Sequence, residues 1–440
     1  MQIPKLTPPE MPAQESAPKL ARPNVRRDEA SSSIPPLPRT ADATGENYET
    51  PSWKPLGKFS VSIVLPLAIG VFMLCMGYLW AGLGFLVIAA IFVFGFLLVG
   101  FRFSDSTLKA PHKPPLTSEE QAALSGDDPV AAERARRVEV LGGLLGREGT
   151  GAYAVFSSAL APADAAVIER NRAAEADATY EWAKGAGEFE RVETASPDGL
   201  RLCAHLLRCA PASKRWVLFA HGYNGNWNEM MLYARHYAER GFNLLMPEMR
   251  GHGDSEGEWI GMGWPDRLDL LAWASWLVSH EGADIEVVLH GHSMGAASVC
   301  LASAEEGLPP QVKATVSDCA YTDALNVFRD VAVKGMGMGA HPLLEIVRAV
   351  FMLRGGYDLA KAAPIDAVPK SRVPLCLFHG EQDSFVAPYM AHKLDEAAGG
   401  AAAGEGHALT MVPGAGHAQS VLADPERYWS RLFGFVDPLL

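Results

Sequence analysis

The stretch IEVVLHGHSMGAASVCLASAEE, residues 285–306, decides how the larger part of this chain folds. It opens with a short apolar run over 285–290, passes through the pentapeptide GHSMG, and continues in an Ala-rich segment that favours a helix. A serine between two glycines, in a tight turn from strand to helix, is held so that its hydroxyl projects from the end of a sheet. The alternative is a glycine-rich turn whose serine has no role. The strand before and the helix after favour the first interpretation, with Ser293 as a nucleophile.

The same alternation of strand and helix extends over about residues 188–440. Short apolar runs alternate with segments of helical periodicity, of which Glu229 to Arg240 and Trp264 to His280 are clear examples. Near-continuous apolar strands separated by amphipathic helices predict a mostly parallel sheet with helices on both faces. In such a sheet the reactive groups lie at the carboxyl ends of the strands. The expected strands are 201–207, 215–220, 242–246, 285–290, 312–317 and 373–379.

A serine hydroxyl is a weak nucleophile, so a base and an orienting acid must lie near it. Asp383 and His417 both follow strand-like runs, and the order serine, acid, histidine is typical of a nucleophile at a strand-to-helix turn. We expect His417 to take the proton of Ser293 and Asp383 to hold the imidazole in place. Asp318 and Glu381 are the alternative acids, and chain order and spacing favour Asp383.

The tetrahedral intermediate of such a reaction needs two N–H donors for its oxyanion. Met294 directly follows the nucleophile at the start of a helix, so its backbone N–H is one candidate. The second donor is expected in the loop HGYNGN (221–226), which follows the strand 215–220. We predict the backbone N–H of Tyr223, because only the main chain is required there.

Six motifs together resemble a known family. In chain order they are HGYNGN (221–226), MRGHGDSEG (249–257), GHSMGA (291–296), SDCAYTD (317–323), HGEQD (379–383) and PGAGH (413–417). The set is similar to the bacterial α/β-hydrolase family grouped with serine-aminopeptidase-like and acyl-ester hydrolases. The resemblance covers residues 188–440 and implies an α/β-hydrolase fold with a helical cap. It also implies Ser293, Asp383 and His417 as a catalytic triad, with Tyr223 and Met294 as oxyanion donors.

A second strong signal lies outside that resemblance. No charged residue occurs between Lys58 and Arg102, a stretch that would span roughly 60 Å as a helix, about twice a hydrocarbon core. Aromatic residues and glycines near its middle predict a turn, so we expect a hairpin of two transmembrane helices within 59–101. Both outer flanks are basic, which favours a multi-pass protein of the cell membrane with a cytoplasmic catalytic domain. The lipid bilayer is therefore an expected partner.

Composition bounds the remaining segments and partners. The Pro-rich residues 1–58 predict a disordered tail, and the Ala-rich residues 102–187 predict a helical juxtamembrane stalk. A formal net charge of −13 argues against nucleic-acid binding, and six cysteines without a CxxC pair indicate a reducing compartment rather than a metal cage. No nucleotide-binding or zinc motif is present, so the chemistry is expected to need neither a cofactor nor a metal.

The substrate is the least determined feature. About residues 321–366 depart from the strand–helix rhythm and predict a helical cap, in which Met336, Met338, Leu343 and Leu344 are candidates to line the substrate pocket. Equally, these side chains can simply pack the cap onto the body. The expected reaction is hydrolysis of a small acyl ester or thioester. A serine aminopeptidase that cleaves short peptides is the alternative within the fold, and a non-catalytic membrane scaffold is a further one.

Overall fold

The computed structural model describes residues 65–76, 78–110, 136–137, 140–141, 162–335, 340–400 and 406–440. The predicted tail over 1–58 lies outside these residues, as do Met336, Met338 and most of the predicted stalk before residue 162.

A single eight-stranded sheet forms the centre of the molecule, in the order β1-β2-β4-β3-β5-β6-β7-β8. The pairs from β4 to β8 are parallel, and β1 and β2 join them by antiparallel pairing. The mostly parallel sheet expected from the sequence is confirmed. The strands are β1 (Glu190–Ala195), β2 (Arg201–Leu207), β3 (Arg215–Ala220), β4 (Asn243–Pro247), β5 (Glu286–His292), β6 (Val312–Asp318), β7 (Leu375–Gly380) and β8 (His407–Val412).

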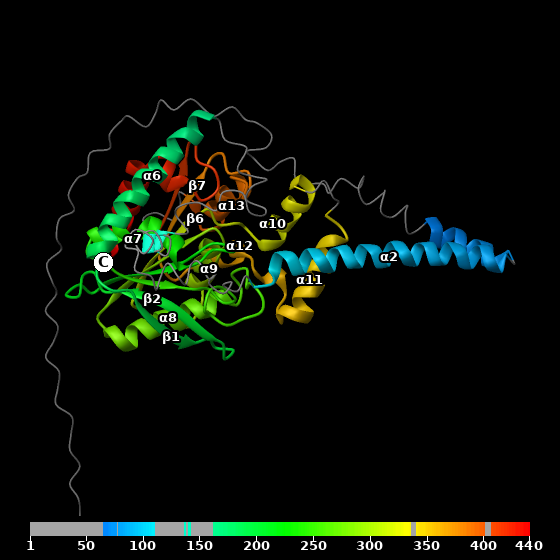
Figure 1. Ribbon diagram of the computed structural model, residues 1–440, viewed down its shortest axis with the longest axis horizontal. Helices are drawn as coiled ribbons and strands as arrows, with labels where there is room; N and C mark the ends of the chain where they lie inside the picture. Colours follow the sequence, from blue (N-terminus) through cyan, green and yellow to red (C-terminus); the bar gives the residue numbers. More distant parts are fainter. Residues whose placement is uncertain are drawn as a thin grey trace, which may run out of the picture.

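Helices cover both faces of the sheet (Figure 1). The helices of the domain and its cap are α6 (Pro162–Gly185), α7 (Met231–Glu239), α8 (Asp266–Glu281), α9 (Met294–Ser303), α10 (Ala324–Asp330), α11 (Leu343–Val350), α12 (Pro364–Ala367), α13 (Tyr389–Ala397), α14 (Ser420–Ala423) and α15 (Pro425–Val436). Shorter turns of 3₁₀ or π type are η4 (Trp227–Met230), η5 (Val331–Gly335), η6 (Phe351–Gly355), η7 (Leu359–Lys361), η8 (Val368–Lys370) and η10 (Asp437–Leu439).

Strand β3 shows how the two faces are filled. Trp216 and Leu218 belong to a buried cluster with α8 and α9, whereas Val217 and Phe219 belong to a second cluster with α6, α7 and α15. All four side chains are almost fully buried, as expected where successive residues of a central strand point to opposite covered faces. The apolar run of the strand is thus explained by two hydrophobic layers.

Helix α6 lies against the sheet domain and does not form part of a free stalk. Its Glu175 carboxylate accepts hydrogen bonds from Arg235 of α7 at 2.8 and 2.9 Å, and its Asn171 side chain donates to the Leu422 carbonyl at 2.8 Å. Tyr180 is buried in the cluster that contains α7 and α15. The stalk prediction is corrected here, because long-range packing that the sequence does not display draws 162–185 into the domain.

Two apolar helices precede the domain, Leu65–Cys75 and α2 (Leu79–Leu108). Within α2, the segment Leu79–Arg102 is 24 residues long, its most apolar part has a mean hydropathy of 2.8, and among the described residues no other helix is both long and apolar enough to cross a membrane. Figure 1 shows α2 projecting away from the sheet domain past α11. Helix α2 includes Gly82, Gly84, Gly95 and Gly100, because glycines within an apolar helix need not break it, and it continues to residue 108, beyond the expected end of the hairpin at 101.

Candidate active site

A strained turn between β5 and α9 carries Ser293. The backbone of this serine has φ 54° and ψ −117°, a region that residues with a side chain rarely adopt. Close packing around the turn explains the flanking glycines. A Cβ added at Gly291 would lie 2.2 Å from the Gly295 carbonyl oxygen, and one added at Gly295 would lie 1.9 Å from the Ala220 carbonyl oxygen. Any larger residue at these two positions would displace main chain, so the motif is required by its geometry.

The predicted triad side chains meet at the carboxyl edge of the sheet. Ser293 Oγ lies 2.8 Å from Nε2 of His417, and Nδ1 of the same imidazole lies 2.7 Å from Oδ2 of Asp383. Asp383 stands in the loop after β7, and His417 stands in the loop after β8. A hydroxyl, an imidazole and a carboxylate that are hydrogen-bonded in this order can transfer the serine proton to the imidazole and stabilise the resulting imidazolium.

Two backbone N–H groups hold the carboxylate of Asp383 in position. Its Oδ1 accepts hydrogen bonds from the backbone N–H groups of Phe385 at 2.9 Å and Val386 at 2.8 Å. His379 also lies near, with Nε2 3.4 Å from Asp383 Oδ2, but that nitrogen is 2.8 Å from the Val386 carbonyl and suits donation to it. Burial lowers the pKa of His379, which favours the neutral ring. The second carboxylate oxygen therefore remains directed at His417.

The two alternative acids, Asp318 and Glu381, make contacts elsewhere. Asp318 ends β6, where its carbonyl accepts the Ser293 backbone N–H at 2.8 Å and its carboxylate accepts the Tyr233 hydroxyl at 3.3 Å. Burial raises the pKa of Asp318 to about 6. Glu381 is exposed, and its backbone N–H donates to Val412. Asp383 is therefore the acid that the structure brings to His417.

The two predicted oxyanion donors belong to adjoining segments. Met294 is the first residue of α9, and the approach of Gly295 to the Ala220 carbonyl brings this helix against the end of β3. The loop that carries Tyr223 follows directly, and a Cβ at Gly222 would lie 2.8 Å from Nε2 of His292. The main chains at 222–223 and 293–294 thus lie at one edge of the sheet. Burial also lowers the pKa of His292 to about 3, so this ring is neutral and does not compete as a base.

Residues 217–431 match the sequence profile of the α/β hydrolase family. This part of the chain belongs to the α/β-hydrolase superfamily. A curated relative, the uncharacterized protein YqkD of Bacillus subtilis, is 25% identical over 229 residues, which cover 50% of this chain and 70% of the relative.

Solved structures are similar at lower identity. An esterase of Pyrococcus furiosus is 20% identical, with a TM-score of 0.45, over 57% of this chain and 93% of the esterase. The acylaminoacyl peptidase of Pyrococcus horikoshii is 16% identical, with a TM-score of 0.44, over 58% of this chain and 43% of the peptidase.

Cys319 is a neighbour of the triad that the sequence did not single out. One ligand atom each from Cys319, Asp383 and His417 lie within 4.8 Å of one another, a spacing that matches a metal-binding group. Burial raises the pKa of the Cys319 thiol well above its usual value, which opposes the thiolate that metal binding requires. The thiol is therefore better understood as a packing group of the hydrolase. Its signal in the sequence is its place directly after β6, inside the SDCAYTD motif.

Of the four cap residues predicted to line the substrate pocket, the structure describes two, Leu343 and Leu344. Leu343 is almost fully buried, in the cluster that also holds Val347 and Phe351 of the cap. Leu344 is partly buried against the same cluster. Leu343 therefore packs the cap onto the body, as the alternative interpretation predicted, whereas Met336 and Met338 lie outside the described residues.

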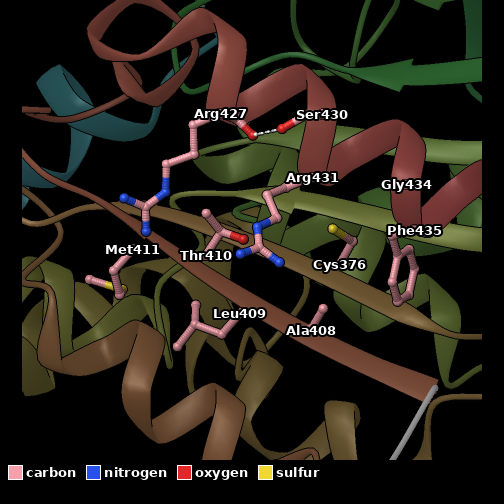
Figure 2. A pocket seen from close by; sticks show the side chains of 10 residues that line it. All are labelled: Cys376, Ala408, Leu409, Thr410, Met411, Arg427, Ser430, Arg431, Gly434 and Phe435. Carbon is pink, nitrogen blue, oxygen red and sulfur yellow. Dashed lines mark hydrogen bonds between the residues drawn. The ribbon is translucent and has the colours of Figure 1, made fainter. Parts of the chain in front are cut away.

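A separate groove of about 430 Å³ lies between β8 and α15 (Figure 2). Arg427 and Arg431 of α15 point over Thr410 and Met411 of the strand, as Figure 2 shows. None of the triad residues lines this groove. It is therefore distinct from the site at Ser293.

Proposed function

We propose that this α/β hydrolase is a membrane-anchored serine hydrolase that cleaves carboxylic ester or thioester bonds through an acyl-enzyme intermediate. The observation that carries the proposal is the hydrogen-bonded line from Ser293 through His417 to Asp383, with contacts of 2.8 and 2.7 Å. The strained backbone at Ser293 adds support, because such strain is concentrated at functional sites.

The first half of the reaction forms the acyl-enzyme. Ser293 Oγ attacks the carbonyl carbon of the substrate while His417 Nε2 takes the hydroxyl proton. Backbone N–H groups of Met294 and Tyr223 stabilise the oxyanion that develops on the carbonyl oxygen. The bond to the leaving alcohol or thiol then breaks, and His417 gives it the proton.

The second half regenerates the serine. Water attacks the acyl carbon while His417 again takes a proton, the bond to Ser293 Oγ breaks, and the proton returns to that oxygen as the carboxylic acid leaves. Asp383 stabilises the imidazolium in both halves and does not itself need to accept a proton. These steps use only the side chains of the chain, the substrate and water.

The contacts of the cap carboxylates favour an ester or thioester over an aminopeptidase substrate. An aminopeptidase needs an acidic group for the free α-amino group of its substrate. Asp323 caps α10 by accepting the Asn326 N–H at 2.8 Å, and Asp358 is engaged by Arg348 at 2.6 Å. Asp323 and Asp358, two cap carboxylates that are candidates to bind such an amino group, are thus already engaged within the cap.

Turnover of two substrate classes tests the reaction. We expect the native chain to hydrolyse short p-nitrophenyl acyl esters and to leave aminoacyl p-nitroanilides intact. Ser293→Ala should abolish the ester activity, while Ser303→Ala should retain it, because that hydroxyl only bonds the Cys300 carbonyl at 2.7 Å within α9. Turnover of the anilides alone would favour the aminopeptidase, and no turnover with either class would favour the scaffold.

Membrane anchoring by a two-helix hairpin, with the catalytic domain in the cytoplasm, is the second part of the proposal. The length and hydropathy of Leu79–Arg102 support one span, the shorter apolar helix Leu65–Cys75 is the described part of the proposed other one, and both flanks of the uncharged stretch are basic. In intact cells, a cysteine at the exposed position Ser275 should react with an impermeant maleimide only after permeabilisation. Reaction in intact cells would place the domain outside.

A further inference from the structure

The apolar helix α2 and the cap are joined by direct contacts. A Cβ added at Gly100 of α2 would lie 2.6 Å from Cγ2 of Ile346 in α11, so these two helices touch at that level. Beyond it, the Arg354 guanidinium lies 2.6 Å from the Asp105 carboxylate. Figure 1 shows α11 crossing beside the domain end of α2. The cap is thereby fixed next to the end of the candidate span.

The level of this contact places the cap at a membrane surface. Arg102 ends the apolar span, and Gly100 lies just inside it. An arginine at the end of such a span lies at the boundary between acyl chains and headgroups. Ile346 therefore meets α2 within its last apolar turn, and Asp105 with Arg354 lies about one turn further out. Any group beside Arg354 must lie at the headgroup boundary as well.

The groups beside Arg354 are exposed and apolar. Leu353 is 85% exposed and Met352 is 49% exposed. After residue 110, the described part of the chain has only one other large hydrophobic side chain with comparable exposure, Val333 of the same cap at 47%. Leu353 directly precedes Arg354, which contacts α2, and an exposed leucine at such a place is expected where lipid, rather than water, surrounds it.

Cationic and aromatic groups adjoin the same place. The Arg354 guanidinium lies 5.0 Å from the ring centre of Phe101 and 4.6 Å from that of Trp259. The Ala110 backbone N–H donates to the Glu258 carbonyl at 2.9 Å, which ties the chain after α2 to the same loop. Arginine and tryptophan side chains are favoured at the interface between acyl chains and headgroups.

We propose that the cap docks on the lipid bilayer through Met352 and Leu353, so that the site at Ser293 receives acyl esters that are dissolved in the membrane. The occupant of this surface is the bilayer itself, because Met352 and Leu353 directly precede Arg354, whose guanidinium contacts Asp105 and Phe101 at the end of the apolar span. The inference rests on the proposed function and deepens it, since it assigns the substrate class. Substrate then diffuses in the plane of the membrane to the cap instead of entering from water.

Depth-dependent quenching tests the docking without requiring catalysis. The full chain, with the exposed Cys75 replaced by serine, carries Leu353→Cys labelled with bimane in vesicles of phosphatidylcholine and phosphatidylglycerol. Lipids with a spin label near the headgroup should quench bimane at 353 several-fold more than bimane at the control position Ser275→Cys, which is exposed on α8. Equal, weak quenching at both positions would overturn the proposal. Shielded emission without lipid quenching would also overturn it, because a protein surface would then cover the patch.

Turnover tests the consequence for substrate. The double variant Met352→Ser with Leu353→Ser should hydrolyse a long-chain p-nitrophenyl ester carried in vesicles roughly tenfold more slowly than the native chain, because two apolar anchors are removed. It should hydrolyse a short, water-soluble ester at an unchanged rate, which also shows that the variant folds. Equal effects on both esters would overturn the proposal. If the native chain hydrolyses neither ester while bimane at 353 is still quenched, the proposed function fails and the docking stands.

Discussion

The triad and the cap are held in place by different kinds of contact. At the triad, short hydrogen bonds join Ser293, His417 and Asp383, and backbone N–H groups at 385 and 386 hold the carboxylate. Between the cap and α2, the contacts are an apolar approach at Gly100, a partly exposed ion pair and rings against a guanidinium. The proposed chemistry thus depends on directional bonds at buried groups, whereas the proposed membrane location depends on apolar surfaces. Substitutions at the triad should change the rate of turnover, whereas substitutions at the contact between the cap and α2 should change stability and lipid contact.

The largest expected effect separates the two buried carboxylates near His417. Asp383→Asn should lower kcat by about 10⁴-fold, because an amide cannot hold the productive tautomer of the imidazole or stabilise its charge. Asp318→Asn should change kcat by less than about tenfold, because the Asp318 contribution to the turn is its carbonyl, which accepts the Ser293 N–H. Steady-state rates on a short ester measure both variants. Equal losses would show that the acid role is shared.

A pH series separates burial from catalysis at Asp318. Burial raises the pKa of the Asp318 carboxyl from 3.8 to about 6 in the folded protein. Between about pH 4 and pH 6 the folded protein therefore keeps a proton on this carboxyl that the unfolded chain has lost. The contribution of this group to stability therefore falls as the pH rises from about 4 to about 6. Relative to the native chain, Asp318→Asn should gain stability across that window, by about 1.4 kcal/mol for each pH unit. Melts at pH 4, 5, 6 and 7 measure the gain, and a difference that does not vary with pH would contradict this account.

Helix α6 provides a test of intermediate size. Burial alone would raise the pKa of Glu175, but hydrogen bonds from His236 and Arg235 outweigh it and hold that pKa below its usual value. Glu175→Gln should therefore lower the free energy of unfolding by about 1–3 kcal/mol. The matched control is Glu239→Gln, which pairs with the same Arg235 but is 52% exposed, and which should change stability by less than about 1 kcal/mol. Thermal melts compare the two, and equal effects would mean that α6 is not held by this contact.

The smallest effect is expected at the ion pair between the cap and α2. The side chains of Arg354 and Asp105 are 38% and 35% exposed, so solvent screens their attraction. Arg354→Ala should change the free energy of unfolding by about 0–1 kcal/mol, a range that includes its contacts with Phe101 and Trp259. A loss above about 2 kcal/mol in the same melts would show that polar contacts, rather than apolar ones, fix the cap to α2.

The sequence predicted the sheet and the positions of the triad because strand ends are local features. Ser293, Asp383 and His417 each follow an apolar run, and a parallel sheet brings the loops after its strands to one edge. The packing of α6 could not be predicted, because Glu175 meets Arg235 across 60 positions and neither residue stands in a distinctive pattern. The orientation of Leu343 was equally hidden, since a buried side chain and a pocket-lining side chain have the same residue type. The contact of Gly100 with Ile346 could not be predicted either, because the two residues are far apart in the chain and no local sequence pattern links them.

Covalent trapping tests the central claim that His417 activates Ser293. The full-length native chain in detergent is treated with a fluorophosphonate probe, and the modified peptide is located by mass spectrometry. The account predicts a single stable adduct on Ser293, formed rapidly in the native chain and greatly slowed in His417→Ala. An adduct at a different residue, or an unchanged labelling rate in His417→Ala, would contradict it.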